Sequence, residues 1–301
     1  MKKTFLYILI LATFFVACGS SYDEQRRLSK EERVRIQKED SAALKIAAVP
    51  TLECLPMFVA KERLMYDTTK LDLRIRRFMA QMDCDTAFAG GSVEGMMSDA
   101  VRVQHMREKG VPTESIASTD IYWLLISNRK ARIKEIGQLG DKMVAMTRFS
   151  ATDDLTDLAL KDTKISSSVF RIQINDVNIR LLMMLNNEMD AAWLAEPYAT
   201  AARLKGNRVV ADSRRIRPDL GVLAFRGNVV NDKGRKRQID AFVDSYNRAC
   251  DSLNHRGLSH YADVFGKYYK VDGKAMNSLA KYRFKHLACF SENTDGVHKH
   301  K

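Results

Sequence analysis

The sequence lacks the residue spacings that mark the common metal sites and hydrolytic active sites. It contains no Cys-x-x-Cys pair, no His-Glu-x-x-His segment and no Gly-x-Ser-x-Gly turn. Each of these motifs holds metal ligands or a nucleophile at a fixed separation. The six histidines are scattered, and two of them, His298 and His300, lie in the C-terminal tail. We therefore expect no metal site, no cofactor and no enzymatic activity.

Long hydrophobic runs are also missing, apart from one near the N-terminus. Lys2 and Lys3 precede an apolar segment, Phe5–Ala17, that is too short to cross a bilayer easily and is followed by Cys18. The segment ends Phe-Val-Ala-Cys, which resembles the lipobox of bacterial lipoproteins with Phe in place of the usual Leu. The resemblance implies that residues 1–18 are a signal peptide and that Cys18 carries the lipid. An uncleaved N-terminal anchor is the alternative.

Either reading places the body of the protein in the cell envelope, held at a membrane and facing the periplasm. Gly19 stands where inner-membrane lipoproteins of many Gram-negative bacteria have aspartate, so the lipoprotein resemblance favours the outer membrane in such a host. Residues 19–43 mix basic and acidic side chains and are expected to be a charged linker. In an oxidising compartment the four remaining cysteines allow one or two disulfides, although their spacing fixes no pairing. They are Cys54, Cys84, Cys250 and Cys289.

The chain has a formal net charge of +12, but it contains no recognisable nucleic-acid-binding motif. The basic residues are spread along the chain except for short clusters at residues 74–77, 214–215 and 233–237, and no aromatic residues are interleaved with these clusters in a recognition pattern. We interpret them as solvated faces that favour anionic lipid or an acidic partner, and we expect no nucleic-acid partner.

Hydrophobic periodicity predicts an α/β protein. Apolar strand patterns at residues 44–49, 71–78 and 93–97 alternate with helical patterns at 55–64, 82–89 and 99–109, and the alternation continues to residue 225. Such alternation implies βαβ units and mixed, mostly parallel sheets. We expect lobe I to begin with 44–128, lobe II to span 129–220, and 221–301 to return to lobe I and add C-terminal helices. Asn128–Arg132 is the predicted crossing between the lobes.

The segment from Lys142 to Asp162 predicts a strand, a polar loop and a helix N-terminus. The free N–H groups of Ser150 to Asp153 would face the crevice at the end of the strand, where ligands bind in such sheets. Ser150 is expected to cap the helix. The ordinary alternative is a helix start with no ligand, and Asp153 and Asp154 already offset the helix dipole.

A weak internal repeat suggests two lobes built on one plan. Val93-Glu94-Gly95 and Met189-Asp190-Ala191 both follow a helix end and lead into a short strand. Two such lobes facing each other would form a cleft.

Three segments resemble type II periplasmic solute-binding proteins, in particular the group similar to alkanesulfonate-binding and NMT1/THI5-like proteins. They are Leu55–Glu62, Ala89–Glu94 and Met189–Tyr198, and the last, which contains Ala-Glu-Pro-Tyr, is the most specific. The resemblance covers about residues 44–225. It implies two α/β lobes, a small solute held in the cleft, and delivery to an ABC permease by a monomer.

The resemblance also implies which loops bind the ligand. Carried over one position at a time, together with one nearby cation, the expected ligand-binding residues are Thr51, Leu52, Ser98, Asp99, Arg148, Ser150, Ala151, Thr152, Asn175, Asp176, Trp193 and Glu196. Trp193 could offer a flat apolar face and Arg148 could pair with an anionic group. Each has an ordinary alternative: Trp193 as core, Arg148 in a surface ion pair, Glu196 at a helix start, and Asp99 as a helix cap.

We therefore expect a lipid-anchored solute-binding component of an ABC importer whose ligand is a small organic, anionic or heteroaromatic solute. Two departures from the family pattern, Cys54 in the first loop and Phe149 before Ser150, leave alternatives open. One is a sensor or accessory lipoprotein with a modified cleft. The other is a THI5-like enzyme, although the cysteine-rich run of that enzyme is missing.

Overall fold

The computed structural model describes residues 30, 32, 34–35, 38 and 40–290. The chain divides into two compact units, Met1–Ala43 and Leu44–Lys301. The predicted signal peptide, Cys18 and the histidines of the C-terminal tail lie outside the described residues. In the first unit, the described residues up to 42 are helical and Arg35 pairs with Glu32, 2.6 Å apart.

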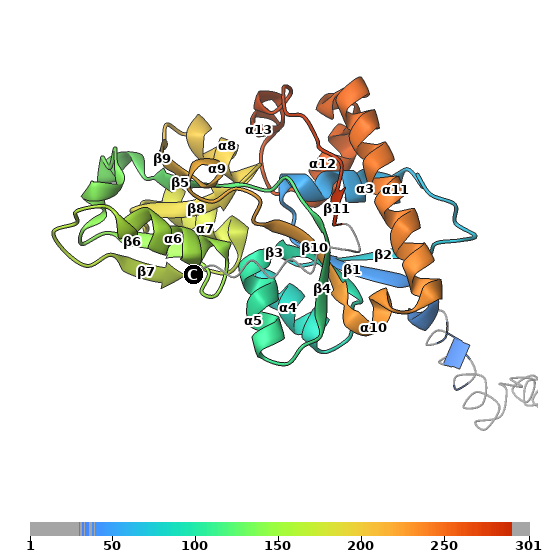
Figure 1. Ribbon diagram of the computed structural model, residues 1–301. Coiled ribbons are helices and arrows are strands. Elements are labelled where there is room, and N and C mark those ends of the chain that lie inside the picture. The colour runs from blue at the N-terminus through green and yellow to red at the C-terminus, as the bar shows by residue number, and fades with distance from the viewer. Residues whose placement is uncertain (1–29, 31, 33, 36–37, 39, 291–301) are drawn as a thin grey trace, which may run out of the picture. The chain divides into compact units, whose positions relative to one another are not determined.

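The second unit contains two mixed β-sheets (Figure 1). The first sheet has the strand order β11-β4-β10-β3-β1-β2, in which β1, β2 and β3 are parallel and β10 is antiparallel to β3 and β4. Its strands are β1 (Leu44–Ala48), β2 (Leu73–Arg77), β3 (Gly95–Asp99), β4 (Thr113–Ser118), β10 (Gly221–Arg226) and β11 (Ala288–Cys289).

The second sheet has the order β7-β6-β8-β5-β9, in which β6, β7 and β8 are parallel and β5 is antiparallel to β8 and β9. Its strands are β5 (Trp123–Ser127), β6 (Met143–Met146), β7 (Phe170–Gln173), β8 (Ala191–Ala195) and β9 (Arg208–Asp212). The predicted two-lobed α/β fold with mixed sheets is confirmed.

Helices pack against both sheets and bury their apolar sides in the cores. The long helix α11 buries Ile239, Phe242, Val243 and Tyr246, as its sequence periodicity predicts. The helices of the first lobe are α3 (Leu55–Glu62), α4 (Gln81–Ala89), α5 (Ala100–Glu108), α10 (Gly227–Val230), α11 (Lys233–Arg256), α12 (Ala262–Tyr268) and α13 (Gly273–Ser278). Those of the second lobe are α6 (Ala151–Lys161), α7 (Val177–Leu185), α8 (Tyr198–Leu204) and α9 (Ser213–Ile216).

The chain crosses between the sheets earlier than the sequence pattern indicated. The expected boundary at residue 128 put the strand at 122–127 in the first lobe, whereas β5 pairs with β8 and β9 of the second sheet. The crossing therefore lies at residues 119–122. Asn128 instead accepts a hydrogen bond from the Lys130 N–H, at 2.8 Å, and caps a short 3₁₀ helix. Polarity alone suggested a crossing there, because capping loops and crossing segments have similar compositions.

The two copies of the internal repeat make equivalent hydrogen bonds, one in each sheet. Glu94 accepts from the Lys45 N–H at the start of β1, and Asp190 accepts from the Met143 N–H at the start of β6, both at 2.8 Å. In each case the acidic residue immediately precedes the central parallel strand, β3 or β8. The two acids therefore accept from equivalent amides at the starts of the interior strands β1 and β6.

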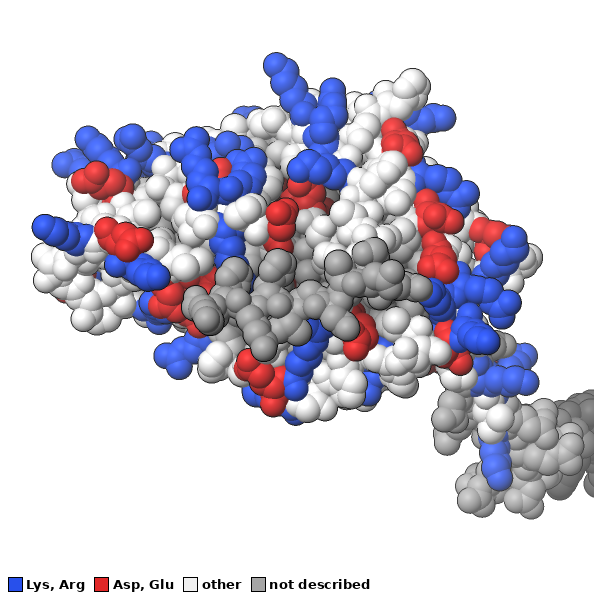
Figure 2. Space-filling model, viewed as in Figure 1, with Lys and Arg blue, Asp and Glu red and all other residues white. Residues whose placement is uncertain are grey.

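The basic clusters identified in the sequence are largely engaged locally. Arg74 pairs with Asp72, Arg214 pairs with Asp212, and Arg77 donates to the carbonyl of Tyr268 at 3.0 Å. On the face shown in Figure 2, basic side chains are interspersed with acidic ones. The cluster at residues 74–77 belongs to the edge strand β2, the one at 214–215 to α9 and the one at 233–237 to the first turns of α11.

Candidate functional site

A cavity of about 60 Å³ lies between the two sheets, at the carboxyl ends of their parallel strands. This is the position at which open α/β sheets bind ligands, and the volume exceeds that needed for a single water. Loops and helix starts from both lobes form its wall. The lining residues are Val49, Thr51, Glu53, Cys54, Gln81, Met97, Ser98, Asp99, Ile121, Trp123, Thr147, Ser150, Thr152, Asn175, Val177 and Arg180.

About half of the residues expected at a ligand site line this cavity. They come from four separate loops, two in each lobe, and the fold brings them together: Thr51, Ser98, Asp99, Ser150, Thr152 and Asn175. The other expected residues lie elsewhere. Arg148 is exposed on the surface, and Leu52 and Glu196 border a smaller neighbouring depression.

Trp193 belongs to the hydrophobic core, which was the alternative to a ligand-binding role for this residue. Its side chain is 0% exposed and packs with Val144, Met146 and Leu155. The indole N–H donates to Thr156 Oγ1 at 2.9 Å. Side chains alternate between the faces of a strand, and this position of β8 faces the core that includes α6. The aromatic residue that lines the cavity is Trp123, which opens β5 and which the sequence analysis did not single out.

Two expected ligand-binding acids are occupied as helix caps. Asp176 accepts from the N–H groups of Asn178 and Ile179 at the start of α7. Glu196 accepts from the Thr200 N–H at 2.8 Å, and its own carbonyl accepts from the Leu52 N–H of the other lobe, also at 2.8 Å. A second backbone bond between the lobes runs from the Val177 N–H to the Met79 carbonyl at 3.2 Å. The lobes are therefore in direct contact beside the cavity.

The N-terminus of α6 begins as predicted, but its amides are not free. Ser150 caps the helix by accepting from the Thr152 N–H at 3.1 Å. The N–H groups of Asp153 and Asp154 donate to the Ser150 carbonyl at 3.0 and 3.1 Å. The remaining amide, that of Ala151, donates to Asp99 Oδ1 at 3.0 Å. The expectation of free donors facing the crevice is corrected for Ala151, Thr152 and Asp153, because other groups of the protein accept from all three amides.

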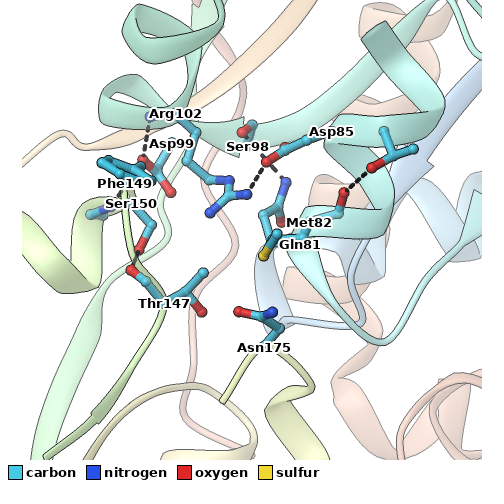
Figure 3. A network of polar contacts seen from close by, with 12 residues as sticks. Gln81, Met82, Asp85, Ser98, Asp99, Arg102, Thr147, Phe149, Ser150 and Asn175 are labelled. Carbon is cyan, nitrogen blue, oxygen red and sulfur yellow. Dashed lines mark hydrogen bonds and ion pairs between the residues drawn. The ribbon is translucent and has the colours of Figure 1, made fainter. Parts of the chain in front are cut away.

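Asp99 lies at the centre of the contact between the lobes (Figure 3). Its Oδ1 also accepts from the Arg102 N–H at 3.0 Å, so it caps α5 as the alternative reading proposed. Only 4% of the residue is exposed, and burial raises the pKa of the Asp99 carboxyl to about 7. Nearby, the Arg102 guanidinium pairs with Asp85, and Gln81 Nε2 donates to Ser98 Oγ at 3.4 Å.

Glu53 is a second buried acid in the cavity wall that the sequence analysis did not identify. It follows β1 in a 3₁₀ turn, and its Oε1 accepts from Thr51 Oγ1 at 2.6 Å and from the Cys54 thiol. Burial raises the pKa of the Glu53 carboxyl to about 7. The sequence could have pointed to Glu53, because it lies two residues after Thr51 in a loop that was already expected at the ligand site.

Arg180 supplies a buried cation to the same wall. Its guanidinium donates to the carbonyls of Ile174 and Trp193 and, at 2.5 Å, to Thr147 Oγ1. Burial lowers the pKa of Arg180 to about 10, which leaves it charged at neutral pH. Because it bonds neutral oxygens, it fixes the loops after β6, β7 and β8 relative to one another.

The buried Glu53 carboxyl predicts a pH-dependent stability. Its pKa is about 7 in the folded protein and near 4.5 when exposed, so between these values the folded state binds more protons than the unfolded state. The free energy of unfolding should therefore fall as pH rises from about 5 to 8. Glu53 contributes up to about 3 kcal/mol of this change, at roughly 1.4 kcal/mol per unit of pKa difference.

Urea denaturation of wild type and Glu53→Gln at pH 5, 6, 7 and 8 would measure this contribution. The variant should be the more stable protein at pH 8 and should show a shallower pH dependence. Glu135→Gln, which removes an exposed acid, is the matched control and should leave the slope unchanged. Equal slopes in wild type and Glu53→Gln would contradict the prediction.

The four cysteines of the second unit have free thiols, so the disulfides that an oxidising compartment would allow are not formed. Cys54, Cys84 and Cys250 are buried in the cores, and Cys289 is exposed on β11. Burial raises the pKa of the Cys84 thiol to about 12 and holds that of Cys54 well above its usual range.

Within the described residues no cluster of His, Cys, Asp and Glu is arranged to hold a metal ion. No helix of the described residues is long and apolar enough to span a membrane.

Solved structures with a similar fold include several ligand-binding proteins. The alkanesulfonate-binding protein of Xanthomonas axonopodis pv. citri, bound to MOPS, matches with a TM-score of 0.71 at 14% identity, over 83% of this chain and 86% of that chain. A ligand-binding component of an ABC-type import system from Staphylococcus aureus, with zinc bound, gives 0.67 at 17%, over 81% and 86%. The periplasmic nitrate-binding protein of Synechocystis gives 0.67 at 13%, over 84% and 74%.

No family model matches the sequence, and no curated protein resembles it closely enough to match. The structural likeness, at these low identities, defines the fold. The chain has the type II periplasmic-binding-protein fold, as the resemblance in its sequence predicted.

Proposed function

We propose that the protein is the solute-binding component of an ABC-type importer and binds a small solute in the cavity between its lobes. The observation that carries this proposal is the cavity itself, which lies at the carboxyl ends of the parallel strands of both sheets. Its wall is mostly polar, with hydroxyl, amide and charged side chains from both lobes converging beside a smaller apolar part that includes Trp123, and such convergent polar groups can orient a small solute. The import proteins that share the fold support the same role.

The proposal includes an anchor and a partner. Lipid on Cys18 would hold the protein at a membrane of the cell envelope, with the charged segment 19–43 as a tether and the second unit facing the periplasm. A monomer would deliver its solute to an ABC permease in the inner membrane. Catalysis is not part of the proposal, because the one cysteine in the cavity wall, Cys54, is held as an unreactive thiol by burial.

A sensor or accessory lipoprotein is the second candidate. The observation that favours it is the small size of the cavity, about 60 Å³, with backbone hydrogen bonds joining the lobes beside it. A cleft that remains in this form would admit only a very small solute.

Native mass spectrometry of the full chain, purified gently in detergent from its own host, separates the two candidates. A single bound mass that leaves on mild unfolding would support the receptor and reveal the composition of its solute. An empty protein that also shows no thermal shift with thiamine precursors, sulfonates, amino acids and small organic anions would overturn the receptor in favour of the accessory role. The intact mass would also report lipid on Cys18, which Cys18→Ser should lose.

A further inference from the structure

One carboxyl oxygen joins the N-termini of two helices that belong to different lobes. Oδ1 of Asp99 accepts from the Arg102 N–H of α5 and from the Ala151 N–H of α6, both at 3.0 Å. Asp99 ends β3 of the first sheet, whereas α6 follows β6 of the second sheet. In Figure 3 the Asp99 carboxyl points across the gap toward the loop that carries Ser150. This contact is therefore a bridge between the lobes and not only a local cap.

The position that Asp99 fills is one that suits an oxyanion. A helix N-terminus directs backbone N–H groups and the positive end of its dipole outward, which favours a negatively charged oxygen. The other amides of the first turn of α6 are already used, because Thr152, Asp153 and Asp154 all donate to oxygens of Ser150. An oxyanion could bind here only by displacing the Asp99 carboxyl from Ala151.

Two acids lie close to the place that an additional anion would take, and the donors of the nearby Arg180 already bind oxygens of the protein. Glu53 is a second acid in the wall, and Asp154 acts on Asp99 as a like charge. Arg180 donates to carbonyls and to Thr147 Oγ1, and the Arg102 guanidinium pairs with Asp85. The Asp99 carboxyl is thus held by backbone amides at a place where both its volume and its charge oppose an incoming oxyanion.

We propose that Asp99 is the specificity-determining residue of the cleft: its carboxyl group takes the oxyanion position at the N-terminus of α6, joins the lobes there and excludes oxyanion solutes. This inference rests on the proposed solute-binding role of the same cavity. It narrows the solute class to molecules that offer hydrogen-bond donors toward the acids of the wall, either uncharged or cationic.

Three variants separate occupancy from charge. Asp99→Ser keeps a cap for α5, because serine is an equally good capping residue, but its shorter side chain cannot reach Ala151. Asp99→Asn removes the charge while its amide oxygen can still accept from both helices. Asp154→Asn is the matched control, because it removes a neighbouring charge that pairs with Arg217 at 2.7 Å and leaves the bridge intact.

Binding of methanesulfonate and of nitrate at pH 8 is measured by titration calorimetry on the full chain in detergent. The fluorescence of Trp123, which lines the cavity, gives a second readout. Asp99→Ser should bind at least one of the two anions about a hundredfold more tightly than wild type, the size of effect expected when the Ala151 N–H becomes free to donate a hydrogen bond to a charged oxygen. Asp99→Asn and Asp154→Asn should gain much less. Hydrogen exchange at the Ala151 amide should accelerate only in Asp99→Ser.

Several results would overturn the inference. Wild type that binds either anion as tightly as Asp99→Ser would show that Asp99 excludes nothing. Equal gains in Asp99→Asn and Asp99→Ser would assign the effect to charge alone and remove the occupancy argument. A folded Asp99→Ser variant with no gain in binding and unchanged exchange at Ala151 would show that the bridge is dispensable. None of these results depends on whether a natural solute co-purifies, so failure here is distinguishable from failure of the proposed function.

Discussion

Replacing Trp193 with alanine should destabilise the protein by about 3–5 kcal/mol, the range for removing a large buried aromatic side chain. The residue is fully buried against Val144, Met146 and Leu155, so its removal leaves a cavity that the sheet and α6 cannot easily close. The hydrogen bond from the indole N–H to Thr156 Oγ1 is lost as well. Since a domain is stable by only about 5–15 kcal/mol, much of the margin would disappear.

The measurement is the free energy of unfolding from urea denaturation, followed by the signal of the remaining tryptophan, Trp123. Trp193→Phe is the informative companion, because it keeps much of the ring volume and loses the hydrogen bond, and it should cost roughly 1–3 kcal/mol. Trp123→Phe, at the partly buried residue that lines the cavity, is the control and should leave stability nearly unchanged. A Trp193→Ala variant with wild-type stability would show that the residue is not part of the core.

Replacing Arg180 with methionine should cost about 2–4 kcal/mol. Two effects oppose each other here. Methionine relieves the burial of a charge, and replacing buried charges by apolar side chains is often neutral or stabilising. However, the change leaves the carbonyls of Ile174 and Trp193 and the hydroxyl of Thr147 without their donor, and each buried group left unpaired costs about 1–3 kcal/mol. With three acceptors affected, the second effect is larger.

Arg180→Lys tests the reason for this loss. Lysine keeps the positive charge but replaces the planar guanidinium fork with a single ammonium group, so it cannot reach all three acceptors at once. The free energy of unfolding of Arg180→Lys should therefore lie between that of wild type and that of Arg180→Met. If Arg180→Met were as stable as wild type while Arg180→Lys was not, the burial of charge would outweigh the hydrogen bonds and the assigned role would be wrong.

The two stability predictions and the Asp99 variants examine different parts of one arrangement. Trp193 supports the second lobe from its core, and Arg180, which itself lines the cavity, holds Thr147, Ile174 and Trp193 together by hydrogen bonds. Asp99 and Glu53 belong to the first lobe and face the cavity. Substitution of Trp193 or Arg180 should change stability, whereas substitution of Asp99 should change which solutes bind.

Most of the fold could be predicted because hydrophobic periodicity is a local property. The helical patterns at residues 55–64 and 82–89 correspond to α3 (Leu55–Glu62) and α4 (Gln81–Ala89), within two residues at each end. Strand β4 was not predicted, because Thr113–Ser118 is half polar and owes its conformation to pairing with β10. The crossing between lobes was misplaced because a capping loop at Asn128 and a crossing loop have similar compositions.

The site was predicted only in part. The family resemblance implied Thr51 and Ser98, and the strand, loop and helix pattern pointed to the loop of Ser150; all three line the cavity, where the loops after parallel strands converge. Trp193 was misplaced because it lies in the middle of β8 and not in the loop after it, so its side chain packs against the core face of the sheet. Glu53 and Arg180 were missed because a single acid or base in the sequence carries no information about its burial.

The sequence by itself determined the α/β class, the two-lobed plan, the helix cap at Ser150 and the loops from which a site could be built. The α/β class and the cap follow from periodicity and capping chemistry, which act over a few neighbouring residues, whereas the two-lobed plan and the site loops rested on the resemblance of short segments to a known family. Only the tertiary structure decided that the amide of Ala151 is satisfied by Asp99, which lies 52 positions away in the chain. A hydrogen bond between two lobes depends on how separate sheets pack, and no local pattern encodes that distance.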